Sequence, residues 1–417
     1  MSDTVELQIA RRSLLRGALS AALLESAKPS AIDTSTEWRN DAANIPFINE
    51  LNTAGESLPF SREYDGVEDH CPFRIRWRTG PNLPVSWKGG ATAAIGGRIL
   101  IAGGLWMPER KNLVYSYEIK TGAYEPAPPV PYETAYTQGV ADADRLVLIG
   151  GRSAGRNVSE LRRNASGKWS WHALTSLPPE EGKGRWLAGT GLVPGRWLFL
   201  VAGHPTGTPS EQRDLPALPN WRMRLGRSNP RWEPMAAYPA GSRALVTTAV
   251  VKGKLYAFGG SNPDRAATPR LRALMTKYEL PIPEGGVPVY RDAFSYDADA
   301  DRWTAIRKVP FPLLGGAGVV IDDRFILLMG TSETKTYRAG KSMGKCSGLW
   351  TGYGDVVLCY DTRRDVYSKV GLMPYGVATC PWIKVGNELF GFGGEPYHWY
   401  NKNTETVLQI GTIEKRI

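Results

Sequence analysis

The sequence predicts an all-β fold, a six-bladed β-propeller whose blades each contain four antiparallel strands. Three observations predict it: an aromatic–proline pair that occurs six times, an apolar strand ending in glycine after each pair, and a composition rich in turn-forming residues. The 417 residues include 46 Gly and 31 Pro, which suits short strands joined by turns better than a helical bundle. Because self-similarity at a regular spacing is the signature of repeat architectures, we expect one large repeat-built domain.

The repeated unit begins with an aromatic residue that is followed seven positions later by proline. The six pairs are Trp77/Pro84, Tyr124/Pro131, Trp171/Pro178, Trp232/Pro239, Trp303/Pro310 and Tyr367/Pro374. Each pair precedes a strand of small residues, a turn and an apolar strand. The glycines that end the apolar strands are Gly103-Gly104, Gly150-Gly151, Gly203, Gly259-Gly260, Gly330 and Gly393-Gly394. Glycine accepts the backbone angles and close approaches expected there, and the aromatic residue is expected to cover the face of the next blade.

Each unit contains about four short apolar runs without helical periodicity, which describes one four-stranded antiparallel blade. After Gly394 only one convincing strand remains, around residues 407–410, so the last blade lacks an outer strand. Residues 73–77 precede the first complete blade and can supply it. We therefore expect an N-terminal strand to close the ring, which leaves few free sheet edges.

The first 31 residues are interpreted as a targeting segment rather than as part of the fold. Adjacent Arg11 and Arg12 precede a short apolar run, which resembles a twin-arginine export signal. The alternative is an ordinary amphipathic start, because Glu25 ends the run early. Export predicts a periplasmic or secreted protein, and the alternative predicts a cytoplasmic one. Residues 32–70 are expected to be an irregular lead-in, and residues 71–417 the propeller.

Glycine doublets followed by a Tyr and a Trp at fixed spacing resemble the kelch repeat, over roughly residues 71–417. Among kelch propellers, the last blade is similar to that of the N-acetylneuraminate epimerase (sialic acid mutarotase) family. The similar residues are Tyr375-Gly376-Val377-Ala378, Pro381-Trp382 and Gly393-Gly394-Glu395. The resemblance implies a propeller of the galactose oxidase-like superfamily and an isomerase that acts on an acidic sugar such as N-acetylneuraminate.

One position departs from what this resemblance implies. The family has a general-base glutamate after the glycine of the fourth blade, whereas this chain has Ser261 there, after Gly259-Gly260. A serine hydroxyl cannot take a proton from an anomeric hydroxyl as a carboxylate does. Glu395 has the Gly-Gly-Glu context, but on the sixth blade. Either Glu395 does related chemistry or the mutarotase activity is absent.

One face of the ring is predicted to be basic and aromatic. The connection into each inner strand and the connection between the second and third strands emerge on the same face. Insertions at residues 204–231, 261–291 and 331–350 fall there and carry 14 Arg and Lys against six Asp and Glu. Arginine pairs with carboxylates and aromatic rings stack on sugars, so a small acidic carbohydrate or glycan is the predicted partner. The candidate binding residues are Trp87, Tyr136, Arg185, Trp186, His204 and Arg243.

Three functional hypotheses follow. In the first, a mutarotase-like epimerase uses Glu395 as the base for the anomeric hydroxyl, and Arg243 or Arg185 holds the sugar carboxylate. In the second, a non-catalytic module binds a glycan or a protein partner through the same face. The third, a lyase or hydrolase, needs two carboxylates at the mouth, and only Glu395 is well placed.

Other partners and cofactors are not expected. The four histidines, His70, His172, His204 and His398, never pair at metal-ligand spacing, which argues against a metal and against copper radical oxidases on kelch propellers. No Gly-rich phosphate loop is recognised, and no other cofactor is expected. No apolar run reaches the roughly 18 to 20 residues of a membrane span. The basic loops contain no recognised nucleic-acid module, so a nucleic-acid partner is not expected.

The chain has an even number of cysteines, Cys71, Cys346, Cys359 and Cys380. Cys359 and Cys380 fall on expected strands, where a buried free thiol is the usual state. For an exported chain, a bridge between Cys71 and Cys346 stays open as an alternative, because nothing in the sequence determines the pairing.

Overall fold

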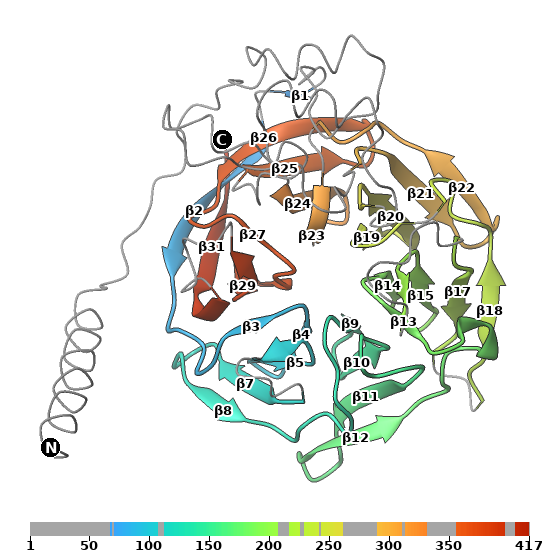
Figure 1. Ribbon diagram of the computed structural model, residues 1–417. Coiled ribbons are helices and arrows are strands. Elements are labelled where there is room, and N and C mark those ends of the chain that lie inside the picture. Colours follow the sequence, from blue (N-terminus) through green and yellow to red (C-terminus); the bar gives the residue numbers. More distant parts are fainter. Residues whose placement is uncertain are drawn as a thin grey trace, which may run out of the picture.

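The computed structural model describes residues 67–68, 71–106, 112–206, 217–225, 229–241, 243–261, 290–310, 313–331, 356–396 and 405–416. Within them, six sheets stand in a ring around a central axis, each built on four antiparallel strands, as Figure 1 shows. This confirms the predicted six-bladed β-propeller and is consistent with a kelch-type ring. The predicted signal, residues 1–31, lies outside the described residues and stays a prediction. None of the helices among the described residues has the length and apolar character needed to cross a membrane.

Blades 1 to 3 run in chain order from the innermost strand to the outermost. Blade 1 contains β4 (Ala91–Ile95), β5 (Arg98–Ala102), β7 (Val114–Glu118) and β8 (Tyr124–Pro126). Blade 2 contains β9 (Gln138–Ala141), β10 (Arg145–Ile149), β11 (Val158–Arg163) and β12 (Trp169–Ala173). Blade 3 contains β14 (Gly189–Val193), β15 (Trp197–Val201), β17 (Asn220–Met223) and β18 (Trp232–Met235).

Blades 4 to 6 complete the ring. Blade 4 contains β19 (Thr247–Val251), β20 (Lys254–Phe258), β21 (Ala293–Asp297) and β22 (Arg302–Ala305). Blade 5 contains β23 (Leu313–Ile321), β24 (Phe325–Thr331), β25 (Val356–Asp361) and β26 (Val366–Leu372). Blade 6 contains β28 (Trp382–Val385), β29 (Glu388–Phe392), β31 (Leu408–Lys415) and, as its outermost strand, β2 (Phe73–Thr79).

The N-terminal strand closes the ring as predicted. β2 pairs antiparallel with β31, from Phe73 opposite Lys415 to Thr79 opposite Gln409. A second contact was not predicted: β1 (Val67–Glu68) pairs in parallel with β26 and extends blade 5. The chain therefore crosses from the edge of blade 5 into blade 6 within a few residues, and it ties the two blades together.

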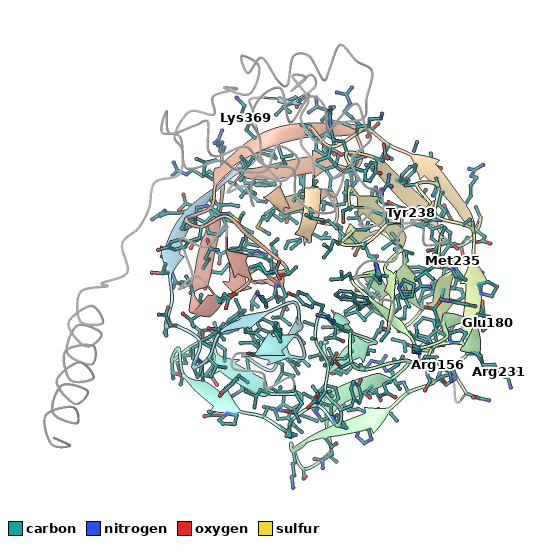
Figure 2. The ribbon with its side chains drawn as sticks, viewed as in Figure 1. Arg156, Glu180, Arg231, Met235, Tyr238 and Lys369 are labelled. Atoms are coloured by element: carbon teal, nitrogen blue, oxygen red, sulfur yellow. The ribbon has the colours of Figure 1, made fainter. Side chains whose placement is uncertain are left out.

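Apolar side chains fill the spaces between neighbouring blades, where most of the core lies (Figure 2). The six repeated aromatic residues lie on the outermost strands, as expected, but they face the preceding blade and not the next one. Trp171, for example, packs against the core between blades 1 and 2, and its Nε1 donates to Pro128 O at 2.9 Å. Trp232 does the same one blade later, donating to Thr175 O at 3.1 Å. For Trp171, Trp232 and Trp303, the chain segment entering the blade offers a backbone carbonyl to the ring N–H.

The glycine signatures occupy points of close backbone approach. Gly150 has a φ of 56°, and a Cβ there would lie 2.3 Å from Arg185 O, in the segment that leads into blade 3. Gly393 has a φ of 55°, and its Cβ would lie 2.2 Å from Trp87 O in blade 1. These two signatures thus let the second strand of one blade end against the backbone of the next blade.

Candidate functional site

Short two-stranded ladders rim one face of the ring. β3 (Trp87–Lys88) pairs with β6 (Leu105–Trp106), β13 (Arg185–Trp186) with β16 (His204–Pro205), and β27 (Val377–Ala378) with β30 (Glu395–Pro396). In blade 4 a single bridge joins Ala244 to Ser261. The segment before each of these inner strands and the segment after its glycine signature therefore emerge on the same face, as the sequence predicts. We call this face the mouth.

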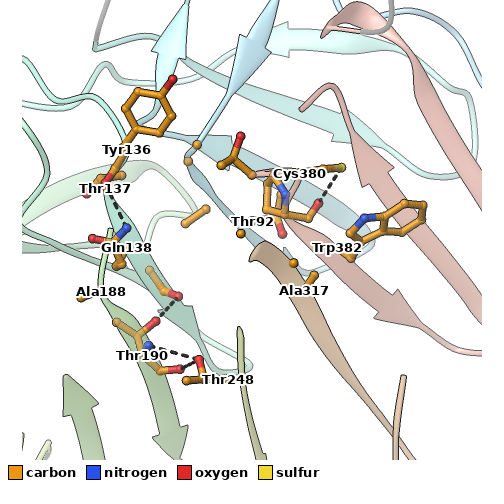
Figure 3. Close-up of a pocket in the computed structure, with 18 of the residues that line it drawn as sticks. Thr92, Tyr136, Thr137, Gln138, Ala188, Thr190, Thr248, Ala317, Cys380 and Trp382 are labelled. Atoms are coloured by element: carbon orange, nitrogen blue, oxygen red, sulfur yellow. Dashed lines mark hydrogen bonds between the residues drawn. The ribbon is translucent and has the colours of Figure 1, made fainter. Parts of the chain in front are cut away.

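Below the mouth, a cavity of about 370 Å³ runs along the axis and is lined by the inner strands of all six blades. Small and polar side chains dominate its wall, including Thr92, Gln138, Thr190 and Thr248. Figure 3 shows Thr190 and Thr248 joined by hydrogen bonds at one end of the view, with Tyr136 at the other. The volume lies at the small end of the range for ligand pockets, which suits a monosaccharide.

Six residues with left-handed backbone angles, one per blade, form a belt at the mouth. Their φ values lie between 49° and 62°, and they are Gly89, Tyr136, Leu187, Leu245, Gly315 and Thr379. The backbone N–H of one member donates to the carbonyl of the member before it, continuously from Leu187 round to Gly89, at 2.7–3.0 Å. Among the described residues, no such bond joins Tyr136 to Gly89 or to Leu187. The Tyr136 carbonyl instead accepts from Gln138 Nε2 at 3.0 Å, so the belt opens at Tyr136.

At this opening the Tyr136 side chain extends across the entry to blade 1 toward blade 6. Its ring lies against the backbone of Gly89, where a Cβ would stand 2.4 Å from Tyr136 Cδ1. The Tyr136 hydroxyl donates to Glu395 Oε1 on blade 6, 259 positions away in the chain. Burial, followed by the charge of Glu395, raises the pKa of Tyr136 well above its ordinary value of 10.0. The phenol therefore keeps its proton at neutral pH.

A lysine joins the same carboxylate from blade 1. Lys88 Nζ lies 3.7 Å from Glu395 Oε1 and 3.2 Å from Glu405 Oε1. The three side chains are 18–23% exposed, so they are shielded but still reached by solvent. Tyr136, Glu395 and Lys88 thus place a phenol, a carboxylate and an ammonium beside the mouth, which is an arrangement suited to proton transfer on a small ligand.

An aromatic wall adjoins these groups. The Trp186 ring lies 5.9 Å from the Tyr136 ring and 5.5 Å from the His204 ring, centroid to centroid. Arg152, an exposed side chain, holds its Cζ 5.5 Å from the centroid of the Trp186 ring. The structure therefore brings Tyr136, Trp186, His204 and Glu395 together, four of the residues singled out in the sequence.

The other three candidates are placed differently. Trp87 is fully buried, and its Nε1 donates to Gly103 O at 2.7 Å. The Arg185 side chain is 0% exposed, pairs with Glu181 through two nitrogens, and donates to Ala202 O at 2.9 Å. As a correction to the prediction, these side chains hold the mouth segments in place and offer no surface to a ligand.

Arg243 belongs with them. Its side chain is 7% exposed, pairs with Asp292 at 3.0 Å, and lies with its Cζ 3.3 Å from the centroid of the Tyr290 ring. Arg243 and Arg185 each precede an inner strand by four residues, and side chains at successive positions of an extended segment point to opposite sides. The sequence pattern places Arg243 and Arg185 on the segments that enter the inner strands, but it does not tell which side of such a segment is buried.

Sequence reasoning missed Lys88, Arg152 and Glu405. Lys88 directly follows the buried Trp87 in β3, as Trp186 follows Arg185 in β13, so register alone could have indicated it. Arg152 follows Gly150-Gly151 and is the blade 2 counterpart of Glu395. Ser261, the blade 4 counterpart, is 2% exposed and has no carboxylate to offer.

Much of the predicted basic face lies outside the described residues. Residues 207–216, 226–228, 262–289 and 332–355 belong to this part, as do His70, Cys346 and His398. The charge of these insertions stays a prediction. Cys71, Cys359 and Cys380 are buried free thiols, as expected for the last two.

No family model matches the chain. Among curated proteins, it is 24% identical to N-acetylneuraminate epimerase of Yersinia pestis (strain Pestoides F) over 195 residues, 42% of this chain and 46% of that protein. It is 21% identical to N-acetylneuraminate epimerase 1 of Escherichia coli O6:H1 (strain CFT073) over 196 residues, 42% of this chain and 48% of that protein. The chain thus spans about half the length of the curated relatives it matches. The resemblance is confirmed as a distant one: this six-bladed propeller is similar to N-acetylneuraminate epimerases.

Proposed function

We propose that the protein is an epimerase that interconverts the anomers of an acidic monosaccharide. The observation that carries the proposal is the contact of Tyr136 with Glu395 beside the cavity, with Lys88 next to the same carboxylate. The distant similarity to N-acetylneuraminate epimerases supports a 2-keto sugar acid of that class as the substrate. The Glu395 carboxylate takes the place of the glutamate that blade 4 lacks.

The chemistry needs one proton removed and one delivered. Glu395 takes the proton of the anomeric hydroxyl, the bond between the anomeric carbon and the ring oxygen breaks, and Tyr136 gives its proton to that oxygen. Burial still raises the pKa of Tyr136 when Glu395 is neutral, but the added effect of the Glu395 charge is gone, so the phenol becomes a better acid when its proton is needed. The proton returns from Glu395 to Tyr136 through their hydrogen bond. Rotation of the open chain and the reverse steps then close the other anomer.

The substrate is held by groups that the mouth leaves accessible. Lys88 and Arg152 supply positive charge for the sugar carboxylate, in place of the buried Arg185 and Arg243. Trp186 offers its ring to the apolar face of the pyranose. The Arg152 guanidinium lies over the same ring and is held there by attraction to the π-system.

Exchange NMR with N-acetylneuraminate tests the proposal, because it measures anomer interconversion at equilibrium. We expect the parent protein to speed the exchange and Glu395→Gln to lower the rate by about 10²- to 10⁴-fold, the usual contribution of a general base. The matched control is Glu125→Gln, a side chain 59% exposed on the outermost strand of blade 1. Equal exchange by parent and Glu395→Gln would contradict the proposal. Saturation transfer without exchange would favour the non-catalytic glycan-binding module.

A further inference from the structure

We propose that Cys71 and Cys359 are a disulfide site, and that their bond locks the closure of the ring between blades 5 and 6. The inference concerns the scaffold and is independent of the activity proposed for the mouth.

Cys71 lies at the crossing of the N-terminal segment. The segment pairs with blade 5 through β1, where Glu68 stands opposite Ser368 of β26. A few residues later it becomes the outermost strand of blade 6, beginning at Phe73. A bond at residue 71 would therefore fix the N-terminal segment at the point where it passes from blade 5 to blade 6 and closes the ring.

The two cysteines are already in contact. Cys71 is 2% exposed and Cys359 1%, and both belong to the apolar core between blades 5 and 6. Cys359 stands opposite Ser368 in the pairing of β25 with β26. The thiols hydrogen-bond to each other, and both hydrogen-bond to the Ser368 side chain. A disulfide needs two such sulfurs to approach to about 2.05 Å, which contacting thiols reach through small side-chain rotations.

The thiols also differ in reactivity. The hydrogen bond from the Cys359 thiol lowers the pKa of Cys71, whereas burial raises the pKa of Cys359. Because a thiolate is the nucleophile in disulfide exchange, Cys71 is the sulfur that attacks first.

The oxidant is a low-molecular-weight disulfide such as oxidised glutathione. The Cys71 thiolate attacks one sulfur of that disulfide, and one small thiol leaves. Cys359, after losing its proton, attacks the Cys71 sulfur of the mixed disulfide, and the second small thiol leaves. The two protein thiols lose two electrons and two protons, and both pass to the oxidant, which ends as two thiols.

The bond would close a loop from residue 71 to residue 359, most of the propeller. Cross-links that close long loops restrict the unfolded chain most, so the oxidised protein should be the more stable form.

The test uses the full chain, purified reduced and then incubated with oxidised glutathione. We expect peptide mass mapping without reductant to show a Cys71–Cys359 cross-link, thiol titration of the unfolded protein to lose two groups, and Tm to rise by about 5 °C. Dithiothreitol should reverse all three changes. The matched control is Cys380→Ser, which removes a buried thiol of the same core that hydrogen-bonds to the backbone carbonyls of Pro381 and Phe392, and it should leave the cross-link and the Tm rise intact.

Cys71→Ser and Cys359→Ser should each abolish the Tm rise. Mapping of the unaltered chain keeps the test decisive if either variant folds poorly. A cross-link of Cys71 to Cys346, a glutathione adduct that persists on Cys71, or no cross-link after full oxidation would each overturn the proposal.

Discussion

Two sectors of the mouth use charged residues in opposite ways. In blade 3, Arg185 and Glu181 are both 0% exposed, and the backbone belt runs unbroken from Leu187 onward. Between blades 6, 1 and 2, Lys88 and Glu395 keep about a fifth of their surface, and the belt opens at Tyr136. The comparison teaches that charged side chains of the mouth serve the scaffold where the backbone belt is closed, and become available for chemistry where it is open.

Arg185→Met should have the largest effect on stability, because it removes one partner of the buried Arg185–Glu181 ion pair in blade 3. It leaves the Glu181 carboxylate buried with only Trp221 Nε1 as a remaining side-chain donor in the described structure, at 2.6 Å. Removing one partner of a buried ion pair costs about 3–5 kcal/mol in the free energy of unfolding. Urea unfolding measures this loss. The double variant Arg185→Met/Glu181→Met should recover part of it, and a single variant as stable as the parent would refute the structural role.

Tyr136→Phe tests the open sector directly. It removes the proton donor while keeping the ring against Gly89, so the exchange rate constant should fall about 100-fold with little change in KM. Because the pKa of Tyr136 is raised above 10.0, the parent should show no loss of exchange from its ionisation up to pH 10. Exchange NMR across this pH range checks both statements, and an unchanged rate constant in Tyr136→Phe would remove Tyr136 from the mechanism.

Lys88→Met tests the contrast with Arg185 and should have the smallest effect on the free energy of unfolding. Since Lys88 and its partners remain partly exposed, the free energy of unfolding should change by no more than about 1 kcal/mol. KM for the acidic sugar should rise about tenfold, because a charge for the carboxylate is lost. Urea unfolding and exchange NMR separate the two effects. A loss of stability as large as that of Arg185→Met would place Lys88 in the scaffold.

Much of the architecture could be predicted from the sequence because the repeats report backbone requirements. The six aromatic residues do lie on outermost strands, and Gly150 and Gly393 do stand where backbones crowd. The site was predicted less well. Glu395 and Trp186 were singled out through their place in the repeat, and the structure puts both at the mouth. Lys88 and Arg152 were passed over, and the Arg185 side chain, predicted to hold a ligand, is buried.

The sequence by itself determined the number of blades, the closing strand and the face that carries the mouth, because local periodicity and glycine placement are properties of neighbouring residues. Only the tertiary structure decided which side chains meet. Tyr136 and Glu395 are 259 positions apart, and Cys71 and Cys359 are still farther apart in the chain. Ring closure brings such pairs together, and whether a charged group ends up buried or accessible depends on how the blades pack. No local pattern contains that information.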